Sequence, residues 1–309
     1  MYKKNTLGIL CSLTLLVSVA QAQLQVAITI DDVPNTRRPG YSSKLRARLT
    51  QMRIPATIFI TESKVYTSKH PGANVQLLAD WIQAATITLG NHTFNHLRYS
   101  EVGFKAFQQD VNRGAQLSKE LGRLYQKDIK YFRFPYNDLG KDSLQHQQIK
   151  TYLKAQQYTI APFTIESSDW MFNYLYEYYL EQGKKQDATR VGKAYVKATL
   201  NYFIYFENLA NGLYKRPVSQ IYLCHDSPLN ADYLPTILAA LQARRYTFIS
   251  LEEALKDDVY KQTESYYKKW GVSWVYRWIK DPRYRSSLMN REPSLEAILK
   301  EYQRVSAQK

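Results

Sequence analysis

Short apolar runs alternate with segments of helical periodicity along most of the chain. Strands are predicted over residues 24–30, 56–60, 86–89, 131–134, 158–165, 220–223 and 246–249. Helices are predicted over residues 42–52, 74–84, 100–124, 142–157 and 232–243, and a capping box at 250–253 predicts the start of one more. Repeated units of a strand followed by a helix are typical of a parallel sheet, either doubly wound or closed as a barrel.

Two segments depart from this alternation. Residues 171–217 form a long helical segment rich in Tyr and Phe, and residues 257–309 form a basic, aromatic tail. For the aromatic residues of 171–217 we favour core packing over sugar contacts, since Tyr at helical spacing usually faces a core. For the tail around residues 270–278 we favour a cover over the barrel rather than a wall-binding surface. No Pro-, Gly- or Ser-rich linker separates a second domain, so we expect one catalytic domain over 23–256 with an insertion and a C-terminal extension.

The first 22 residues have the pattern of an export signal. Lys3 and Lys4 precede an apolar run over 7–20, and Ala20-Gln21-Ala22 has the small-x-small form of a cleavage site. The run is shorter than the roughly 20 residues that a membrane-spanning helix needs. We therefore predict a cleaved signal peptide over 1–22, with an uncleaved N-terminal anchor as the alternative. The chain is then exported, to the periplasm, the cell envelope or the medium.

Composition narrows the class of protein and of partner. Of 309 residues, 45 % are hydrophobic and 22 % charged, which excludes a wholly disordered, collagen-like or coiled-coil chain. The net charge of +15 favours an anionic partner, but the basic residues are spread out and form no nucleic-acid-binding motif. We expect an anionic cell-envelope surface and no nucleic acid, with solubility as the simpler explanation of the charge. Beyond the signal only Cys224 remains, so no intramolecular disulfide forms, and no second stretch is long enough to span a membrane.

Reactive side chains gather at the ends of the predicted strands, where parallel α/β folds place their active sites. Asp31-Asp32 closes the first strand, and two adjacent carboxylates need a cation or an arginine to compensate them, unless they only form a turn. His92 and His96 follow the third strand, and their spacing lets two imidazoles converge on one ion if the segment turns helically.

Three further groups follow later strands. Arg133-Phe134-Pro135-Tyr136 offers a guanidinium suited to binding a carboxylate, and the proline favours an extended Phe134; a surface turn is the alternative for this motif. Asp169-Trp170 and His225 follow two more strands, and a core position is the alternative for this histidine.

Taken together and in this order, these groups resemble the five motifs of the NodB-homology polysaccharide deacetylases, carbohydrate esterase family 4. The resemblance covers roughly residues 24–255. It implies a distorted (β/α) barrel with fewer than eight full units. The sequence departs from the usual motifs at Val33, where glycine is missing, at Glu166, where aspartate is common, and at Asn137, where glycine often follows Tyr136.

The resemblance also implies a role for each matching residue. Asp32, His92 and His96 match the ligands of a divalent metal, with zinc the first choice and cobalt or nickel also suited to such a site. Asp31 matches the general base that takes a proton from water, and Arg133 is expected to tether Asp31 and keep it ionised.

The remaining matches concern the oxyanion and the leaving group. The backbone amide of Tyr136 is expected to meet the oxyanion together with the metal. His225, held protonated by Asp169, is expected to donate a proton to the departing amine. Trp170 packs against a sugar face or belongs to the core.

The function so implied is metal-dependent hydrolysis of N-acetyl groups of an amino-sugar glycan, peptidoglycan or chitin-like, to acetate and free amine. Three alternatives stay open at this stage. They are an O-acetyl esterase acting on a polysaccharide, a catalytically silent carbohydrate-binding module of the same fold, and an aromatic, basic envelope scaffold.

Overall fold

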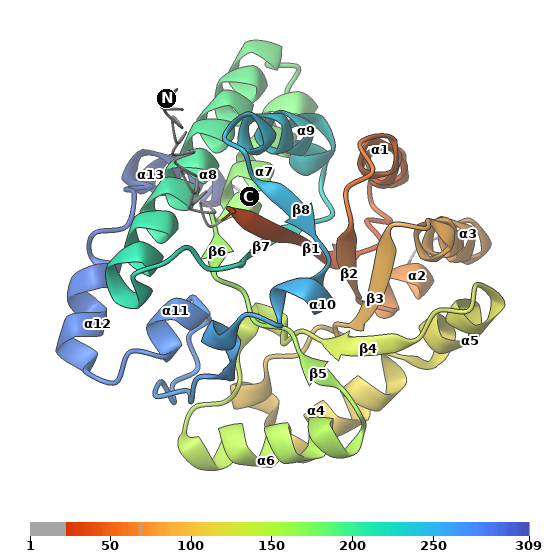
Figure 1. Cartoon of the computed structure of the whole chain (residues 1–309). Helices are drawn as coiled ribbons and strands as arrows, with labels where there is room; N and C mark the ends of the chain where they lie inside the picture. The colour runs from red at the N-terminus through yellow and green to blue at the C-terminus, as the bar shows by residue number, and fades with distance from the viewer. Residues whose placement is uncertain (1–22, 68–69, 309) are drawn as a thin grey trace, which may run out of the picture.

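A computed structural model describes residues 23–67 and 70–308, so the predicted signal peptide over 1–22 lies outside the described residues. One sheet forms the centre of the molecule (Figure 1). Its strands are β1 (Gln25–Val33), β2 (Ala56–Ile60), β3 (Ile87–Asn91), β4 (Ile129–Phe132), β5 (Thr159–Ile160), β6 (Ile165–Glu166), β7 (Gln220–His225) and β8 (Thr247–Ile249).

Every strand pairing in this sheet is parallel, as the alternation of strands and helices predicts. The strand order is β5-β4-β3-β2-β1-β7-β6, and β8 pairs with the first residues of β1. The two edge strands, β5 and β6, are consecutive in the chain, which curls the sheet into a half-barrel. The distorted (β/α) barrel predicted from the sequence is therefore confirmed.

Helices surround the strands on the outside (Figure 1). In chain order they are α1 (Pro39–Gln51), α2 (Ser63–Tyr66), α3 (Pro71–Gln83), α4 (Tyr99–Arg113), α5 (Gln116–Leu124), η1 (Pro135–Asn137), α6 (Ser143–Ala155), α7 (Asp169–Glu181), α8 (Lys185–Tyr214), α9 (Pro228–Ala243), α10 (Leu251–Ala254), η2 (Asp258–Lys261), α11 (Trp274–Arg277), α12 (Pro282–Met289) and α13 (Glu296–Ser306). Within the described ranges, no helix has both the length and the apolar character needed to cross a membrane.

The central strands are buried on both faces, because helices cover the outside of the half-barrel and apolar side chains fill its inside. All five residues of β2 are buried, and in β1 only Gln25 and Asp32 reach intermediate exposure. Ile28, Ile30 and Ile58 are at most 1 % exposed, and burying each such side chain stabilises the fold by about 1.5–3 kcal/mol. This rigid centre fixes the positions of the loops that follow each strand.

The single helix predicted over 100–124 is wrong, because the chain breaks between α4 and α5. Ala115 has a φ of −129°, which no α-helix accommodates. The break lies where Gly114 meets the loop after β3, and a Cβ atom on Gly114 would lie 2.3 Å from the carbonyl carbon of Thr93. Close approach of two backbones therefore ends the helix, and hydrophobic periodicity does not report such an approach.

The single strand predicted over 158–165 is also wrong. Thr159 and Ile160 pair with β4, whereas Ile165 and Glu166 pair with β7 at the other edge of the sheet. The residues between them bridge the two edges, since the Ala161 N–H donates to Phe132 and the Thr164 N–H donates to Ile221. The apolar run is thus divided between two edges.

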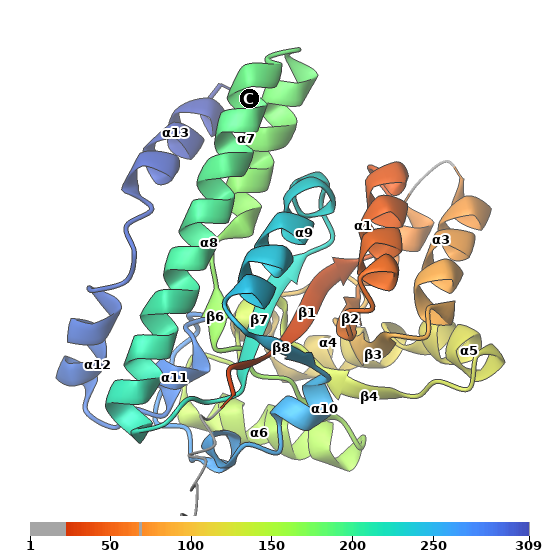
Figure 2. The same cartoon turned by 45° about the horizontal axis from the view of Figure 1, so that its top comes forward.

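The helical segment predicted over 171–217 is folded as two helices, α7 and α8, which pack against each other and against α9. Figure 2 shows them side by side, with α13 of the C-terminal segment alongside α7. Their aromatic residues mostly face the core: Phe172, Tyr176, Tyr179, Tyr195, Tyr202, Phe203 and Phe206 are buried. Trp170, at the first turn of α7, is exposed.

Candidate active site

The two carboxylates at the end of β1 are brought to the site by a local irregularity of the strand. The pairing register between β1 and β2 shifts between Ile30 and Val33, and Asp32 has a φ of 68°. Without such a shift, successive side chains of a strand point to opposite faces. Asp31 and Asp32 instead both line the same cleft.

Two histidines reach the same cleft from the loop after β3. His92 directly follows the strand, and its Nδ1 lies 2.7 Å from the carbonyl oxygen of Arg133. Because a carbonyl only accepts hydrogen bonds, Nδ1 carries the hydrogen and Nε2 keeps its lone pair. His96 has a φ of 58°, which turns the loop back so that its ring centre lies 4.9 Å from that of His92.

Asp32, His92 and His96 offer ligand atoms that all lie within 4.8 Å of one another. Burial lowers the pKa of both histidines, so both imidazoles are neutral at pH 7. Burial also opposes ionisation of Asp32, but neighbouring positive charge, that of Lys64 first, outweighs it and holds the pKa of Asp32 far below its usual value. Two neutral imidazoles and one carboxylate, with His92 fixed by a backbone carbonyl, are a donor set that fits zinc or a similar divalent ion.

Asp31 lies against Arg133, but the contact is incomplete. Arg133 Nη1 is 3.6 Å from Asp31 Oδ2, and within residues 23–67 and 70–308 neither Asp31 Oδ1 nor Arg133 Nη1 has a hydrogen-bond partner. Arg133 instead donates from Nη2 to Thr29 and to the carbonyl of Pro162. Burial raises the pKa of Asp31 to about 6, and Arg133 only partly offsets this effect. Arg133 thus favours the ionised form of Asp31, although burial has the larger influence on the pKa of this carboxyl group.

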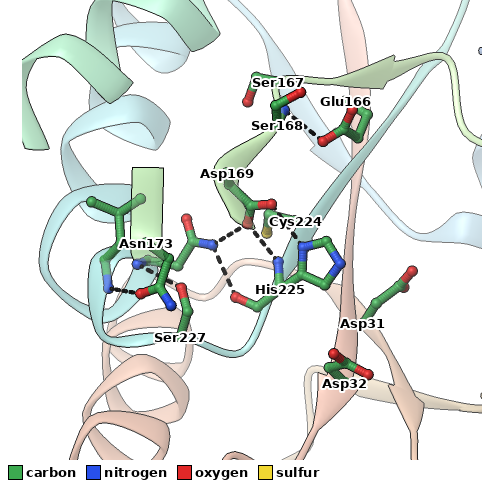
Figure 3. Close-up of polar contacts among 12 residues, drawn as sticks. Asp31, Asp32, Glu166, Ser167, Ser168, Asp169, Asn173, Cys224, His225 and Ser227 are labelled. Carbon is green, nitrogen blue, oxygen red and sulfur yellow. Dashed lines mark hydrogen bonds and ion pairs between the residues drawn. The ribbon is translucent and has the colours of Figure 1, made fainter. Parts of the chain in front are cut away.

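His225, the last residue of β7, is paired with Asp169 at the start of α7 (Figure 3). His225 Nδ1 lies 2.7 Å from Asp169 Oδ1, and the backbone N–H of His225 donates to Asp169 Oδ2 at 2.8 Å. Asn230 also donates to Asp169 Oδ2, at 2.6 Å. Burial lowers the pKa of His225, but the Asp169 carboxylate outweighs burial and raises it to about 10. His225 is thus a cation at pH 7, and Figure 3 shows its ring between Asp169 and the pair Asp31 and Asp32.

The loop after β4 carries Tyr136 to the rim of the cleft. Phe134 is extended, as the following proline predicts, and Tyr136 has a φ of 56°. The Tyr136 ring centre lies 4.7 Å from that of His96, and half of the side chain is exposed. Asn137 has a φ of 50°, and asparagine tolerates this left-handed conformation better than most residues. That tolerance explains how Asn137 stands where glycine is common.

Eight of the nine site residues predicted from the sequence line one cleft of about 750 Å³: Asp31, Asp32, His92, His96, Tyr136, Asp169, Trp170 and His225. The ninth, Arg133, lies behind Asp31 and is 1 % exposed. The cleft opens at the carboxyl ends of the strands, where the sequence places the reactive groups. The fold therefore brings together side chains from residues 31 to 225.

The sequence did not reveal several other residues of the cleft. Lys64, on α2, approaches Asp32 Oδ2 to 3.2 Å and donates to its backbone carbonyl at 2.9 Å. Trp270 and Gly271 reach the cleft from the C-terminal segment. Glu166 accepts from the Ser168 N–H at 2.5 Å, and burial raises its pKa to about 7. Of these residues, the sequence pointed only to Glu166, which departs from a family motif. No neighbouring sequence feature distinguishes Lys64 from other lysines or Trp270 from other tryptophans.

Comparisons with known proteins agree with this fold. Three solved structures share the fold: a wild-type pseudoenzyme of carbohydrate esterase family 4 from Bacillus anthracis, and the peptidoglycan deacetylase PdaC and the family 4 carbohydrate esterase PdaA, both from Bacillus subtilis. The first is 14 % identical, with a TM-score of 0.53 and a match covering 75 % of this chain and 66 % of that one. PdaC is 19 % identical (TM-score 0.50; 76 % and 92 % covered), and PdaA is 18 % identical (TM-score 0.50; 76 % and 81 % covered).

These identities are low enough that the structures show a common fold and nothing more. Among curated proteins, none matches the chain. The model of the polysaccharide deacetylase family, however, matches residues 19–157, which include the Asp31-Asp32, His92–His96 and Arg133–Tyr136 motifs. The resemblance drawn from the sequence is thereby confirmed over these residues, where the chain matches the polysaccharide deacetylase family.

Proposed function

We propose that the chain is a divalent-metal-dependent deacetylase that hydrolyses N-acetyl groups of an amino-sugar glycan. The observation that carries the proposal is the arrangement of three elements in one cleft. A buried carboxylate, Asp31, lies next to the ligand set of Asp32, His92 and His96, and a histidine cation, His225, faces the same space. Amide hydrolysis needs a base for water and an acid for the leaving amine, and the two groups supply these opposite roles.

Asp32, His92 and His96 would hold the ion, with zinc preferred and cobalt or nickel also suited. When bound there, a divalent ion polarises the acetyl carbonyl and makes water more acidic. Lys64 keeps Asp32 ionised, and the Arg133 carbonyl keeps the His92 ring in the orientation that presents Nε2.

The side chains of this protein would carry the protons of the reaction. Asp31 accepts a proton from the attacking water as the new C–O bond forms. The backbone N–H of Tyr136 donates to the oxygen of the acetyl carbonyl as negative charge develops on it. His225 donates its Nε2 proton to the amide nitrogen as the C–N bond breaks, because Nδ1 is engaged with Asp169. The products are acetate and the free amine of the sugar.

Export would bring this activity to an envelope glycan such as peptidoglycan. The predicted signal peptide over residues 1–22 and the net charge of +15 support that location, since a basic protein is attracted to an anionic envelope. N-terminal sequencing of the protein from fractionated cells should find Gln23 as the first residue, in the periplasmic or secreted fraction. An intact Met1 in the cytoplasmic fraction would contradict export.

The deciding experiment measures acetate release from N-acetylglucosamine oligomers and from peptidoglycan. We expect release to stop with EDTA and to return with zinc or cobalt. His92→Ala should lose both metal binding and activity, whereas His70→Ala is the matched control because His70 is exposed and lies outside the cleft. Metal content measured on both variants separates loss of the ion from loss of the fold.

Two outcomes would redirect the proposal. Turnover of acetylated xylan or aryl acetates without amide hydrolysis would identify an O-acetyl esterase. Metal binding and glycan binding without acetate release would identify a silent binding module, and the pseudoenzyme among the similar structures shows that this fold also occurs without activity.

A further inference from the structure

The cleft is much larger than its chemistry requires, and its outer part is aromatic. Its volume of about 750 Å³ is that of sites which enclose whole ligands, roughly 300–1,000 Å³. Three large aromatic side chains line it and remain about half exposed: Trp170 at 48 %, Tyr136 at 50 % and Trp270 at 58 %. Large apolar side chains that stay accessible inside a cleft mark the surface on which a ligand packs.

Trp270 differs from the other two because it comes from the C-terminal segment. None of the five motifs lies in that segment, and the residues between η2 and α11 form no helix or strand. It nevertheless lies directly against the loop that carries Tyr136. A Cβ atom on Gly271 would come within 2.3 Å of the Tyr136 carbonyl oxygen and 2.9 Å of Asn137 Cβ. Only glycine therefore allows this approach, which places Trp270 beside Tyr136.

One buried arginine holds the two loops together. Arg277 Nη2 donates to the carbonyl of Trp270 at 3.0 Å and to the carbonyl of Asn137 at 3.1 Å. The guanidinium is fully buried and is paired with Glu264, 2.7 Å away. One hydrogen bond from Arg277 thus holds the backbone of Trp270, and a second ties it to the loop of Asn137.

The same stretch of chain is anchored to the residues that bridge the two edges of the sheet. Trp274 donates its N–H to the carbonyl of Phe163 at 3.0 Å, and Ser273 Oγ donates to the carbonyl of Thr164 at 2.6 Å. A binding side chain held on a rigid support loses little entropy when its ligand arrives. The side chain of Trp270 is therefore exposed, whereas hydrogen bonds hold the backbone around it in place.

The surroundings of Trp270 suit a sugar ring. Lys269 Nζ lies over one face of the Trp270 ring, 5.0 Å from its centre, so a hydrogen-bond donor stands at the aromatic surface. A pyranose presents C–H groups on its faces and hydroxyl groups at its rim, which matches an indole flanked by an ammonium group. The Tyr136 ring lies 4.7 Å from that of the candidate ligand His96, and Gly271, the residue after Trp270, packs against the Tyr136 backbone.

We propose that Trp270 forms a second sugar-binding position, which packs against the pyranose ring next to the one that carries the acetyl group. The inference rests on the proposed function, because it takes the substrate to be a glycan. It makes the C-terminal segment part of the active site rather than only a cover for the barrel, and it makes a chain of sugars, not a single sugar, the preferred substrate.

The test compares the N-acetylglucosamine hexamer with the single sugar. For Trp270→Ala we expect kcat/KM on the hexamer to fall about tenfold, mainly through KM, and to fall by far less on the single sugar. Trp270→Phe should recover part of the loss. Tyr284→Ala is the matched control, since Tyr284 is a similarly exposed aromatic residue of the same segment that does not line the cleft. If Trp270→Ala and Tyr284→Ala give the same ratio of hexamer to single-sugar activity, the proposal is overturned.

Calorimetric titration with the hexamer keeps this test separate from the proposed function. If the wild type releases no acetate but binds the hexamer, and Trp270→Ala weakens binding about tenfold, the sugar position stands and the deacetylase proposal falls. If the wild type is active and Trp270→Ala binds the hexamer as tightly as the wild type does, the deacetylase proposal stands and the sugar position falls. Failure of the wild type to bind either the hexamer or soluble peptidoglycan fragments would also overturn the sugar position.

Discussion

Two buried arginine–carboxylate pairs in this protein differ in how completely they are satisfied. At the carboxyl ends of the strands, Arg133 Nη1 is 3.6 Å from Asp31, and Arg133 Nε, Arg133 Nη1 and Asp31 Oδ1 have no hydrogen-bond partner among the described residues. In the C-terminal segment, Arg277 Nη1 is 2.7 Å from Glu264, Nη2 donates to two carbonyls and Nε donates to a third, that of Val272. Both guanidinium groups are at most 1 % exposed.

This difference moves the pKa values of the two carboxyl groups in opposite directions. Burial raises both, but around Glu264 it is outweighed by His146, Arg277 and Lys150, which bring the pKa down to about 2. Around Asp31 burial prevails, and the pKa rises to about 6. A fully satisfied pair stabilises structure, whereas an incompletely satisfied one leaves a carboxylate that can take up a proton near neutral pH.

The largest expected effect comes from removing the basic group of the incomplete pair. Asp31→Asn keeps the size of the side chain but cannot accept the proton from water. We expect kcat/KM for acetate release to fall about 1,000-fold, within the 10²–10⁴ range of general-base catalysis. Steady-state kinetics with metal present would measure this loss, and the melting temperature should stay close to that of the wild type.

Asp80→Asn is the control for this substitution, because Asp80 lies on α3 outside the cleft, 3.9 Å from Arg46. It should leave kcat/KM unchanged. An Asp31→Asn variant that keeps more than a tenth of the activity with metal bound would show that Asp31 is not the base.

The complete pair should respond in the opposite way, through stability. Arg277→Met removes the cation from Glu264 and leaves the carbonyls of Trp270 and Asn137 without their donor. Breaking a buried pair by removing one partner costs about 3–5 kcal/mol, and we expect the free energy of unfolding to fall by that amount. Urea unfolding of the full chain would measure it.

A second variant separates the charge from the packing. Glu264 also contacts Lys150 and His146, so its carboxylate keeps some compensation in Arg277→Met. Adding Glu264→Gln removes the remaining buried charge, and the double variant should recover part of the lost stability. If adding Glu264→Gln lowers the free energy of unfolding of Arg277→Met by as much as an independent substitution would, the two residues do not act as a pair.

The incomplete pair, Arg133 and Asp31, lies in the part of the molecule whose arrangement could be predicted from the sequence. The carboxyl ends of parallel strands lie at the same end of the sheet. The residues that follow these strands therefore lie close together, regardless of the details of the loops. That rule brought Asp31, His92, Arg133 and His225 together although nearly 200 residues separate the first from the last. Family motifs supplied the roles, because the residues alone left a turn open for Asp31 and Arg133 and a core position open for His225.

The complete pair could not be predicted, for a physical reason. Glu264 and Arg277 lie in a stretch with little regular structure, and hydrophobic periodicity says nothing about which carbonyls a guanidinium reaches. The approach of Gly271 to Tyr136, like that of Gly114 to Thr93, depends on tertiary packing. The same limit applies to the division of residues 158–165 between two sheet edges, because a short apolar run does not specify its partner strand.

The smallest of these effects concerns a third ion pair, His225 and Asp169, which is complete like that of Arg277 yet lies in the cleft. Its histidine has a pKa raised from 6.5 to about 10, because the Asp169 carboxylate outweighs burial. The cation therefore persists as pH rises until about pH 10.

In Asp169→Asn the carboxylate charge is gone and burial remains, so the pKa of His225 should fall to its ordinary value or below. At pH 8 we expect kcat to be about 30-fold lower than in the wild type, the ratio of protonated fractions for pKa values of about 10 and 6.5.

The pH dependence distinguishes this explanation from mere misplacement of the ring. If Asp169 keeps His225 charged, the ratio of wild-type to variant kcat should be small at pH 6, grow about tenfold per pH unit above the pKa of the variant, and level off near pH 10. If Asp169 only orients the ring through its bond to Nδ1, the ratio will be the same at every pH. A pH-independent ratio would therefore place His225 with the structural pairs and leave the leaving amine without its acid. A rising ratio would mean that a complete ion pair can serve catalysis when the charge it maintains is the one that reacts.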